Sequence, residues 1–186
     1  MQRLENRELV LCALFIALIT VGTFIRIPVG ADVFTLQFMF TLLAGLMLGA
    51  RLGAIAVGSY ILLGLIGVPV FASGGGPSYV LQPSFGYLLG FFLQAWFCGK
   101  YSRKLKSINF TTVLKVNVGG MAIVYVIGLI WFYVFSNYVV AAPISVWATI
   151  FYCGVLQIGP DFLLCVGAAI LGVRCYKVGL WLKLSK

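Results

Sequence analysis

The sequence predicts an all-α integral membrane protein, a single bundle of six transmembrane helices with both termini in the cytoplasm. Of its 186 residues, 62% are apolar and only 9% are charged, whereas a soluble domain carries roughly a quarter charged residues. Short runs of Lys and Arg also separate long apolar segments. The length suits one compact unit, so we expect residues 1–186 to form a single transmembrane domain.

Six segments are apolar enough to be membrane spans, because a helix needs ~20 mostly apolar residues to cross a bilayer. They are residues 9–25, 34–50, 53–68, 85–99, 113–136 and 146–173. The first four are short. The last contains Gly159 and Pro160, where we expect a kink because proline interrupts helical hydrogen bonding.

The distribution of positive charge predicts the topology. With both termini in the cytoplasm, every one of the 13 Lys and Arg residues except Arg26 falls on the inner side, as the positive-inside rule requires. Residues 29–31 resemble a signal-peptide cleavage site, which leaves a cleaved first segment as an alternative. Glu5 and Glu8 argue against it, because a signal peptide begins with a positively charged region.

Several functional classes are disfavoured by what the sequence lacks. The net charge of +9 is not arranged as a basic stripe with aromatic residues, which disfavours nucleic-acid binding. Histidine is absent, the five cysteines form no CxxC pair, and no GxxxxGK[ST] motif occurs, so we expect no metal, no cofactor and no ATPase site. An intramembrane enzyme and a purely structural subunit remain the weaker alternatives to a binding protein.

Asp161 is the most informative residue because it is an acidic side chain inside a predicted span. Burying an ionised carboxylate there costs several kcal/mol, so it needs a partner or a function. A structural hydrogen bond to another helix is one interpretation. Acceptance of a polar ligand group is the other, favoured by Pro160, which opens the backbone locally.

An irregular segment, residues 67–87, is expected on the outer side. It contains three consecutive glycines and three prolines, and irregular backbone at membrane depth survives only where protein covers it or where it lines a cavity. A plain outer loop is possible, but we expect a wall or lid of a binding site. Its candidate binding residues are Phe71, Tyr79, Gln82, Ser84 and Tyr87.

Three further residues are candidates at the outer end of the bundle. Arg26 either extends to lipid headgroups or binds an anion, which could be a ligand or Asp161. Thr35 and Gln37 are expected to open the second helix directly after Asp32, where their roles are capping and packing or ligand binding.

Small residues four positions apart recur along the predicted helices, as at Gly45 and Gly49 or Gly86 and Gly90. Such pairs let another helix backbone approach closely, and internal packing is the simplest interpretation of most of them.

Several motifs in sequence order resemble the BioY family, the biotin-specific S components of energy-coupling factor (ECF) transporters. They are FTLQ at 34–37, LAGL at 43–46, GVPVF at 67–71 and PSFGYLLGF at 83–91, the last being a variant of the family's PTGGYLxGF signature. The likeness runs from residue 26 to 99, and the six-helix plan with Pro160-Asp161 extends it over nearly the whole chain.

The resemblance implies a subunit of the cytoplasmic (inner) membrane that binds biotin in an outer pocket, capped by the loops after its first and third helices. It also implies a transmembrane coupling subunit and two ATPases as partners, although some family members act without them. The family's AxxxA motif on the first helix, which meets the coupling subunit, is matched by Ala13 and Ala17. Asp161 would accept the ureido N–H groups of biotin, and the aromatic residues of the outer segment would pack on its rings.

Two positions depart from the family pattern. Leu164 stands where the family usually has a Lys one turn after the Asp, and Phe85 replaces a glycine of the signature. Arg26 could supply the missing cation from the capping loop. A different vitamin or a biotin-like compound therefore remains the alternative ligand.

Overall fold

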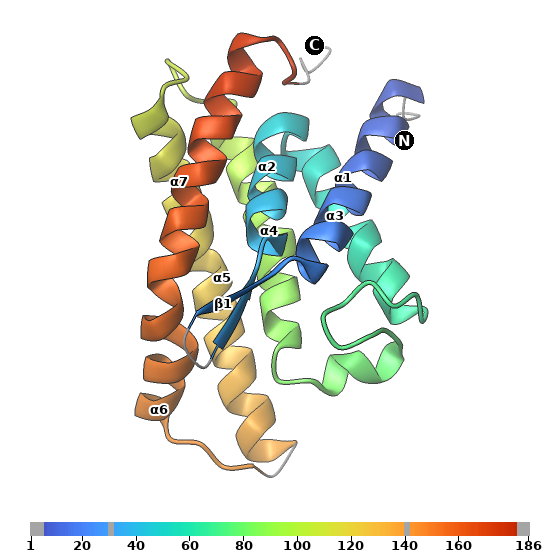
Figure 1. The fold of residues 1–186 in the computed structure, drawn as a ribbon, viewed down its shortest axis with the longest axis vertical. Helices are drawn as coiled ribbons and strands as arrows, with labels where there is room; N and C mark the ends of the chain where they lie inside the picture. The colour runs from blue at the N-terminus through green and yellow to red at the C-terminus, as the bar shows by residue number, and fades with distance from the viewer. Residues whose placement is uncertain (1–5, 30–31, 140–141, 182–186) are drawn as a thin grey trace.

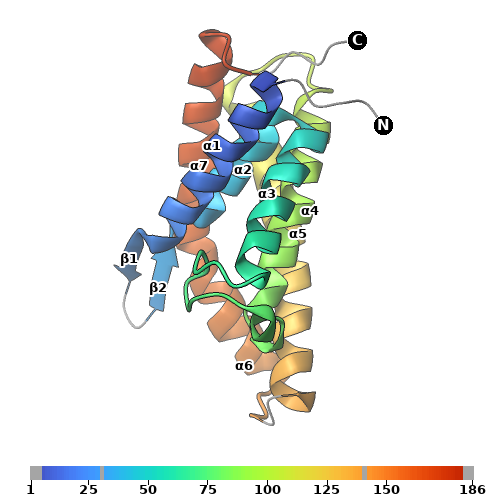
Figure 2. The ribbon, with the colours of Figure 1, turned by 90° about the vertical axis from the view of Figure 1, so that its right-hand side faces the viewer.

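The protein folds as an elongated bundle of helices with a small β-hairpin on one side (Figures 1 and 2). The computed structural model describes residues 6–29, 32–139 and 142–181, together with their side chains outside residues 26–34. The elements are α1 (Asn6–Phe24), β1 (Arg26–Val29), β2 (Asp32–Thr35), α2 (Gln37–Leu48), α3 (Ala50–Leu65), η1 (Pro77–Leu81), α4 (Phe85–Ser102), α5 (Phe110–Tyr138), α6 (Val146–Ile150), η2 (Phe151–Val155) and α7 (Leu156–Lys177).

Three helices are long and apolar enough to cross a membrane: α1, α5 and the continuous helix Val146–Lys177 that comprises α6, η2 and α7. α2 and α3 are apolar but shorter. Counting that continuous helix once, the described residues hold six helices besides the short 3₁₀ turn η1. α1 begins and α7 ends at the same end of the bundle (Figure 1).

The hairpin was not expected from the sequence. β1 and β2 pair antiparallel, with Arg26 opposite Thr35 and Val29 opposite Asp32. Pro28 and the β-branched residues around it favour extended backbone over helix. The prediction that Thr35 opens the second helix was therefore wrong, because it ends β2, and Leu36 occupies the N-cap position without a side-chain cap.

The helix continues through Gly159 and Pro160, where the sequence predicted a kink, and a π-helical turn lies shortly before them at Phe151–Val155. α7 runs through Pro160, and the preceding turn, η2, is π-helical. Proline cannot donate a backbone hydrogen bond and crowds the carbonyl one turn earlier, so the helical pattern changes just before it. π-turns inside helices are frequent at functional sites.

Glycines bring the central helices into backbone contact. A Cβ at Gly53 of α3 would lie 2.9 Å from the Cα of Gly45 in α2, and one at Gly90 of α4 would lie 2.9 Å from the Cα of Val124 in α5. A Cβ at Gly45 would also collide with the carbonyl oxygen of Ala95 in α4. The small-residue spacings at these glycines thus serve packing within the bundle.

Buried polar side chains link the helices across this packed centre. Thr41 of α2 donates to the amide oxygen of Gln94 in α4 at 2.9 Å, and the Asn117 amide of α5 donates to the carbonyl of Cys165 in α7 at 3.0 Å. Side-chain hydrogen bonds across helices in an apolar environment favour one arrangement of the bundle.

We expect Gly45→Ala to destabilise the protein, because the added methyl group overlaps Ala95 backbone and overpacking costs about 1–3 kcal/mol. Gly167→Ala is the matched control: a Cβ there would meet only the Met39 sulfur at 3.6 Å, an ordinary contact. Thermal unfolding in detergent should show a lower Tm for the first variant alone. Equal midpoints for the two variants would contradict the packing described.

Candidate functional site

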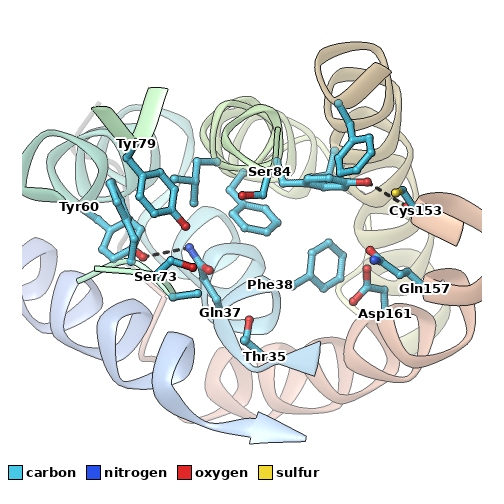
Figure 3. A pocket seen from close by; sticks show the side chains of 17 residues that line it. Thr35, Gln37, Phe38, Tyr60, Ser73, Tyr79, Ser84, Cys153, Gln157 and Asp161 are labelled. Carbon is cyan, nitrogen blue, oxygen red and sulfur yellow. Dashed lines mark hydrogen bonds between the residues drawn. The ribbon is translucent and has the colours of Figure 1, made fainter. Parts of the chain in front are cut away.

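A cavity of about 300 Å³ lies between the helices, close to the hairpin and the segment that follows α3. Its walls come from α2, α3, the α3–α4 segment, α4, α5 and the continuous last helix, and Figure 3 shows its side chains. The lining residues are Thr35, Gln37, Phe38, Tyr60, Phe71, Ala72, Ser73, Tyr79, Ser84, Tyr87, Leu88, Phe91, Val124, Phe132, Cys153, Gln157 and Asp161.

One end of the cavity is acidic and belongs to α7. Asp161 and Gln157 lie together there, one helical turn apart (Figure 3). The hydroxyl of Tyr125, on α5, donates to Asp161 Oδ2 at 2.7 Å. This end therefore combines a carboxylate with an amide, and one carboxylate oxygen is held from outside the cavity.

The opposite end is polar, and none of the described side chains there is a carboxylate. Tyr60 is its centre: its hydroxyl donates to the Val70 carbonyl at 2.9 Å and receives a hydrogen bond from Gln37 Nε2 at 3.2 Å. Thr23 Oγ1 lies 3.1 Å from the same hydroxyl. Ser73 is beside Gln37 in Figure 3. This group, Tyr60, Gln37 and Ser73, is called the amide end below.

Aromatic side chains close the wall beside the amide end. Phe71 is 1% exposed, and its ring lies between those of Tyr60 and Tyr79, with centroid distances of 5.5 and 4.4 Å. Phe38 lies between the two polar ends in Figure 3. Phe91, whose ring centroid is 6.1 Å from that of Phe38, also lines the cavity. The cavity is thus polar at both ends and apolar between them.

The segment after α3 is held in place by backbone hydrogen bonds. Gly76 N donates to Gly64 O at 2.7 Å, and Phe71 N donates to Gly74 O at 2.9 Å. Gly74 and Gly76 have φ values of 105° and 117°, which favour glycine. The prediction that these residues form a wall rather than a plain loop agrees with Phe71 and Ser73 lining the cavity.

A hydrogen bond fixes the wall on the far side. The hydroxyl of Tyr87, on α4, donates to the carbonyl of Cys153 in the π-helical turn at 2.9 Å. A π-turn leaves its carbonyls less regularly paired, and Tyr87 takes one of them as its acceptor. Both residues line the cavity.

Most candidate site residues come together in this cavity. Those that line it are Thr35, Gln37, Phe71, Tyr79, Ser84, Tyr87 and Asp161. Gln82 is exposed and lies outside the lining, at the end of η1. Arg26 lies in β1, and its side chain is outside the described part of the structure. Ala13 and Ala17 are exposed on α1.

The sequence analysis missed the polar site residues Gln157, Tyr60, Tyr125 and Ser73, the last of which lies in the segment predicted as a wall. Gln157 could have been found by its spacing, since it lies four residues before Asp161 on one helix face. Tyr60 and Tyr125 are hydroxyl-bearing residues in apolar helices. Nothing in their local sequence distinguishes them from packing residues, because their partners come from other helices.

The arrangement suits binding of a small molecule rather than covalent chemistry. Largely apolar cavities of this size with a few placed polar groups are typical small-molecule sites. The hydrogen-bonded groups at the two ends would orient a ligand that has polar groups at both of its own ends.

Comparisons with known proteins find a family and several relatives of this chain. The family model "BioY family" matches residues 1–179. A protein of Lysinibacillus sphaericus described as "Probable biotin transporter BioY" is 42% identical over 172 residues, which are 92% of this chain and 87% of that protein. The "Biotin transporter BioY" of Thermotoga maritima is 42% identical over 124 residues, 66% of this chain and 72% of that one.

The fold also matches a solved structure, the S-component for biotin from an ECF-type ABC transporter. The TM-score is 0.82 at 27% sequence identity, and the match covers 97% of this chain and 100% of the other. The structural likeness, the apolar helices and the transporter relatives together mark a multi-pass membrane protein. With the family match running from residue 1 to residue 179, this chain belongs to the BioY family.

Proposed function

We propose that this protein takes up biotin as the substrate-binding subunit of an ECF-type transporter, and that biotin binds in the cavity between α2, α4 and α7. The observation that carries the proposal is a cavity with a carboxylate at one end, hydrogen-bond donors at the other and aromatic residues between. The choice of ligand is supported by the relatives described as biotin transporters and by the solved structure described as the S-component for biotin.

The two ends of the cavity orient the ligand. Biotin has a ureido ring with two N–H donors at one end and a carboxylate at the other. Asp161 accepts N–H groups but repels a second carboxylate in an apolar environment. The ureido ring therefore belongs beside Asp161 and Gln157, and the ligand carboxylate belongs beside the N–H and O–H donors of the amide end.

In this orientation the amide end provides hydrogen-bond donors for the ligand carboxylate. No lysine is then needed one turn after Asp161, where this chain has Leu164. Gln37 donates one amide hydrogen to Tyr60 and keeps a second for a ligand. Arg26 stays a predicted cation for the ligand carboxylate, and its side chain is outside the described part of the structure.

The transport role places the protein in the cytoplasmic membrane with six spans and both termini inside. The start of α1 and the end of α7 at one end of the bundle support an even number of crossings (Figure 1). The cavity lies toward the hairpin, away from the end that holds the termini. In this orientation the cavity therefore faces the outside. ATP hydrolysis then comes from partner subunits, as in ECF-type transporters.

Contact with a coupling subunit is assigned to α1. Ala13 and Ala17 are exposed one turn apart, on the side of the helix away from the buried Phe15 and Ile19. Two small residues at this spacing let a second helix approach closely in a membrane.

Asp161→Asn should weaken biotin binding about a hundredfold, because an amide replaces the charge that accepts the ureido N–H groups and presents donors to donors. Equilibrium binding of labelled biotin to the detergent-purified chain measures this. Saturable binding by the wild type with unchanged affinity in the variant would move the site away from α7, and no binding by the wild type at micromolar biotin would remove biotin as the ligand.

Gln37→Leu should weaken biotin binding about tenfold and affect the neutral amide of biotin less, because hydrogen bonds to a carboxylate are roughly twice as strong as neutral ones. Gln82→Leu is the matched control, since Gln82 is exposed outside the cavity. Competition binding with the two ligands provides the measurement. Equal losses for biotin and its amide would place the ligand carboxylate elsewhere.

Ala13→Trp with Ala17→Trp should reduce co-purification of the coupling subunit while changing biotin affinity by less than about twofold, because both side chains are exposed and neither lines the cavity. Val126→Trp with Ile130→Trp is the control: it adds two bulky side chains at exposed positions one turn apart on α5. Reduced co-purification in the control as well would show that bulk anywhere on the surface causes the loss.

A further inference from the structure

The carboxylate of Asp161 is held by a residue that has no place in the cavity wall. Tyr125 belongs to α5, is 8% exposed, and is absent from the lining, yet its hydroxyl lies 2.7 Å from Asp161 Oδ2. A ligand in the cavity would touch Asp161 without touching Tyr125. Any effect of Tyr125 on binding must then pass through the carboxylate.

An aspartate in this position needs such a contact to present one oxygen to a ligand. The terminal torsion of an aspartate has broad, roughly two-fold preferences, so the side chain alone does not fix its oxygens. A short hydrogen bond from a hydroxyl to a carboxylate is strong, and it fixes Oδ2 on the side of α5. Oδ1 is then left for the cavity.

Among the residues whose side chains the structure describes, no cation holds the Asp161 carboxylate in place. Leu164, three residues after Asp161 on the same side of α7, is apolar and packs against the core. Among the described residues, Tyr125 donates a hydrogen bond to the carboxylate. Burial of a carboxylate is costly without hydrogen bonds, which makes this contact important in the empty protein as well.

We propose that Tyr125 is a positioning residue for ligand recognition, which holds Asp161 so that its second oxygen accepts an N–H group of a cyclic urea. The proposal deepens the proposed function and rests on it. Tyr125 thereby favours ligands that present an N–H donor to the cavity side of the carboxylate, because the other oxygen is held by the tyrosine.

The Tyr125 hydroxyl, which favours ligand binding when residue 161 is Asp, should oppose it when Asp161 is replaced by Asn. The Tyr125 hydroxyl then takes the amide oxygen as its acceptor and turns the amide N–H groups toward the cavity, where they meet the N–H groups of the ligand. Removing the hydroxyl frees the amide to rotate and offer its oxygen instead. A tyrosine that only stabilised the fold would not change the sign of its effect in this way.

A double-mutant cycle with Tyr125→Phe and Asp161→Asn tests the proposal by equilibrium binding of labelled biotin to the purified full chain. Tyr125→Phe alone should weaken binding about tenfold, as expected for the loss of one charge-assisted hydrogen bond. In the Asp161→Asn background the same change should leave the affinity unchanged or partly restore it. Tyr133→Phe, on the same helix beside a separate apolar groove, is the control and should bind like the wild type.

Losses that simply multiply in the double variant, or no loss in Tyr125→Phe, would overturn the role of Tyr125. A lower Tm for Tyr125→Phe together with multiplicative losses would assign Tyr125 to stability instead. Failure of the wild type to bind biotin at all would count against the proposed function, a result that is distinct from either of these.

Discussion

The site depends on keeping a carboxylate in the middle of an apolar bundle. Asp161 lies on a membrane-spanning helix, where an unpaired charge costs several kcal/mol, and its compensation comes from Tyr125 on another helix. The contact therefore joins α5 to α7 and leaves the cavity side of the carboxylate open. The π-helical turn before Pro160 lies in the same wall, so backbone irregularity and buried charge occur together where the ligand is proposed to bind.

Close packing of the other helices is what allows these groups to converge. Gly45 and Gly53 bring α2 and α3 into backbone contact, and Gly90 does the same for α4 and α5. Because protein interiors are packed at nearly crystalline density, helices fixed this closely give their side chains little freedom. The two polar ends of the cavity are presented by helices whose relative positions are set by residues without side chains.

The segment after α3 has irregular backbone, whose polar groups need hydrogen-bond partners at membrane depth. Its polar backbone groups form hydrogen bonds within the protein, as between Gly76 N–H and the Gly64 carbonyl. The Tyr60 hydroxyl donates to the Val70 carbonyl and so holds the start of the segment. Such backbone is stable at this depth only where protein satisfies it. One tyrosine thereby links the segment to Gln37, so the wall and the amide end of the cavity form one hydrogen-bonded unit.

Much of this could be read from the sequence because the signals are local. The apolar runs, the charge distribution and the isolated Asp161 reflect the cost of placing polar groups in lipid, which each segment meets by itself. The glycine spacings likewise indicated packing before its partners were known. The hairpin of residues 26–35 was missed because its short strands lie next to apolar segments that resemble helices.

Tertiary structure alone decided which polar residues meet. Tyr125 is 36 positions from Asp161 and Tyr60 is 23 positions from Gln37, and no periodicity within one helix predicts a hydrogen bond between two. It also separated Gln82 from its neighbours Tyr79 and Ser84, because the chain becomes extended at Gln82, directly after the 3₁₀ turn η1, and the Gln82 side chain is exposed outside the cavity. The sequence by itself thus determined that the chain enters the membrane and holds one buried acid there, since burial cost acts on each residue separately. The packing of helices determined the shape and polarity of the site, because those arise only from contacts between distant residues.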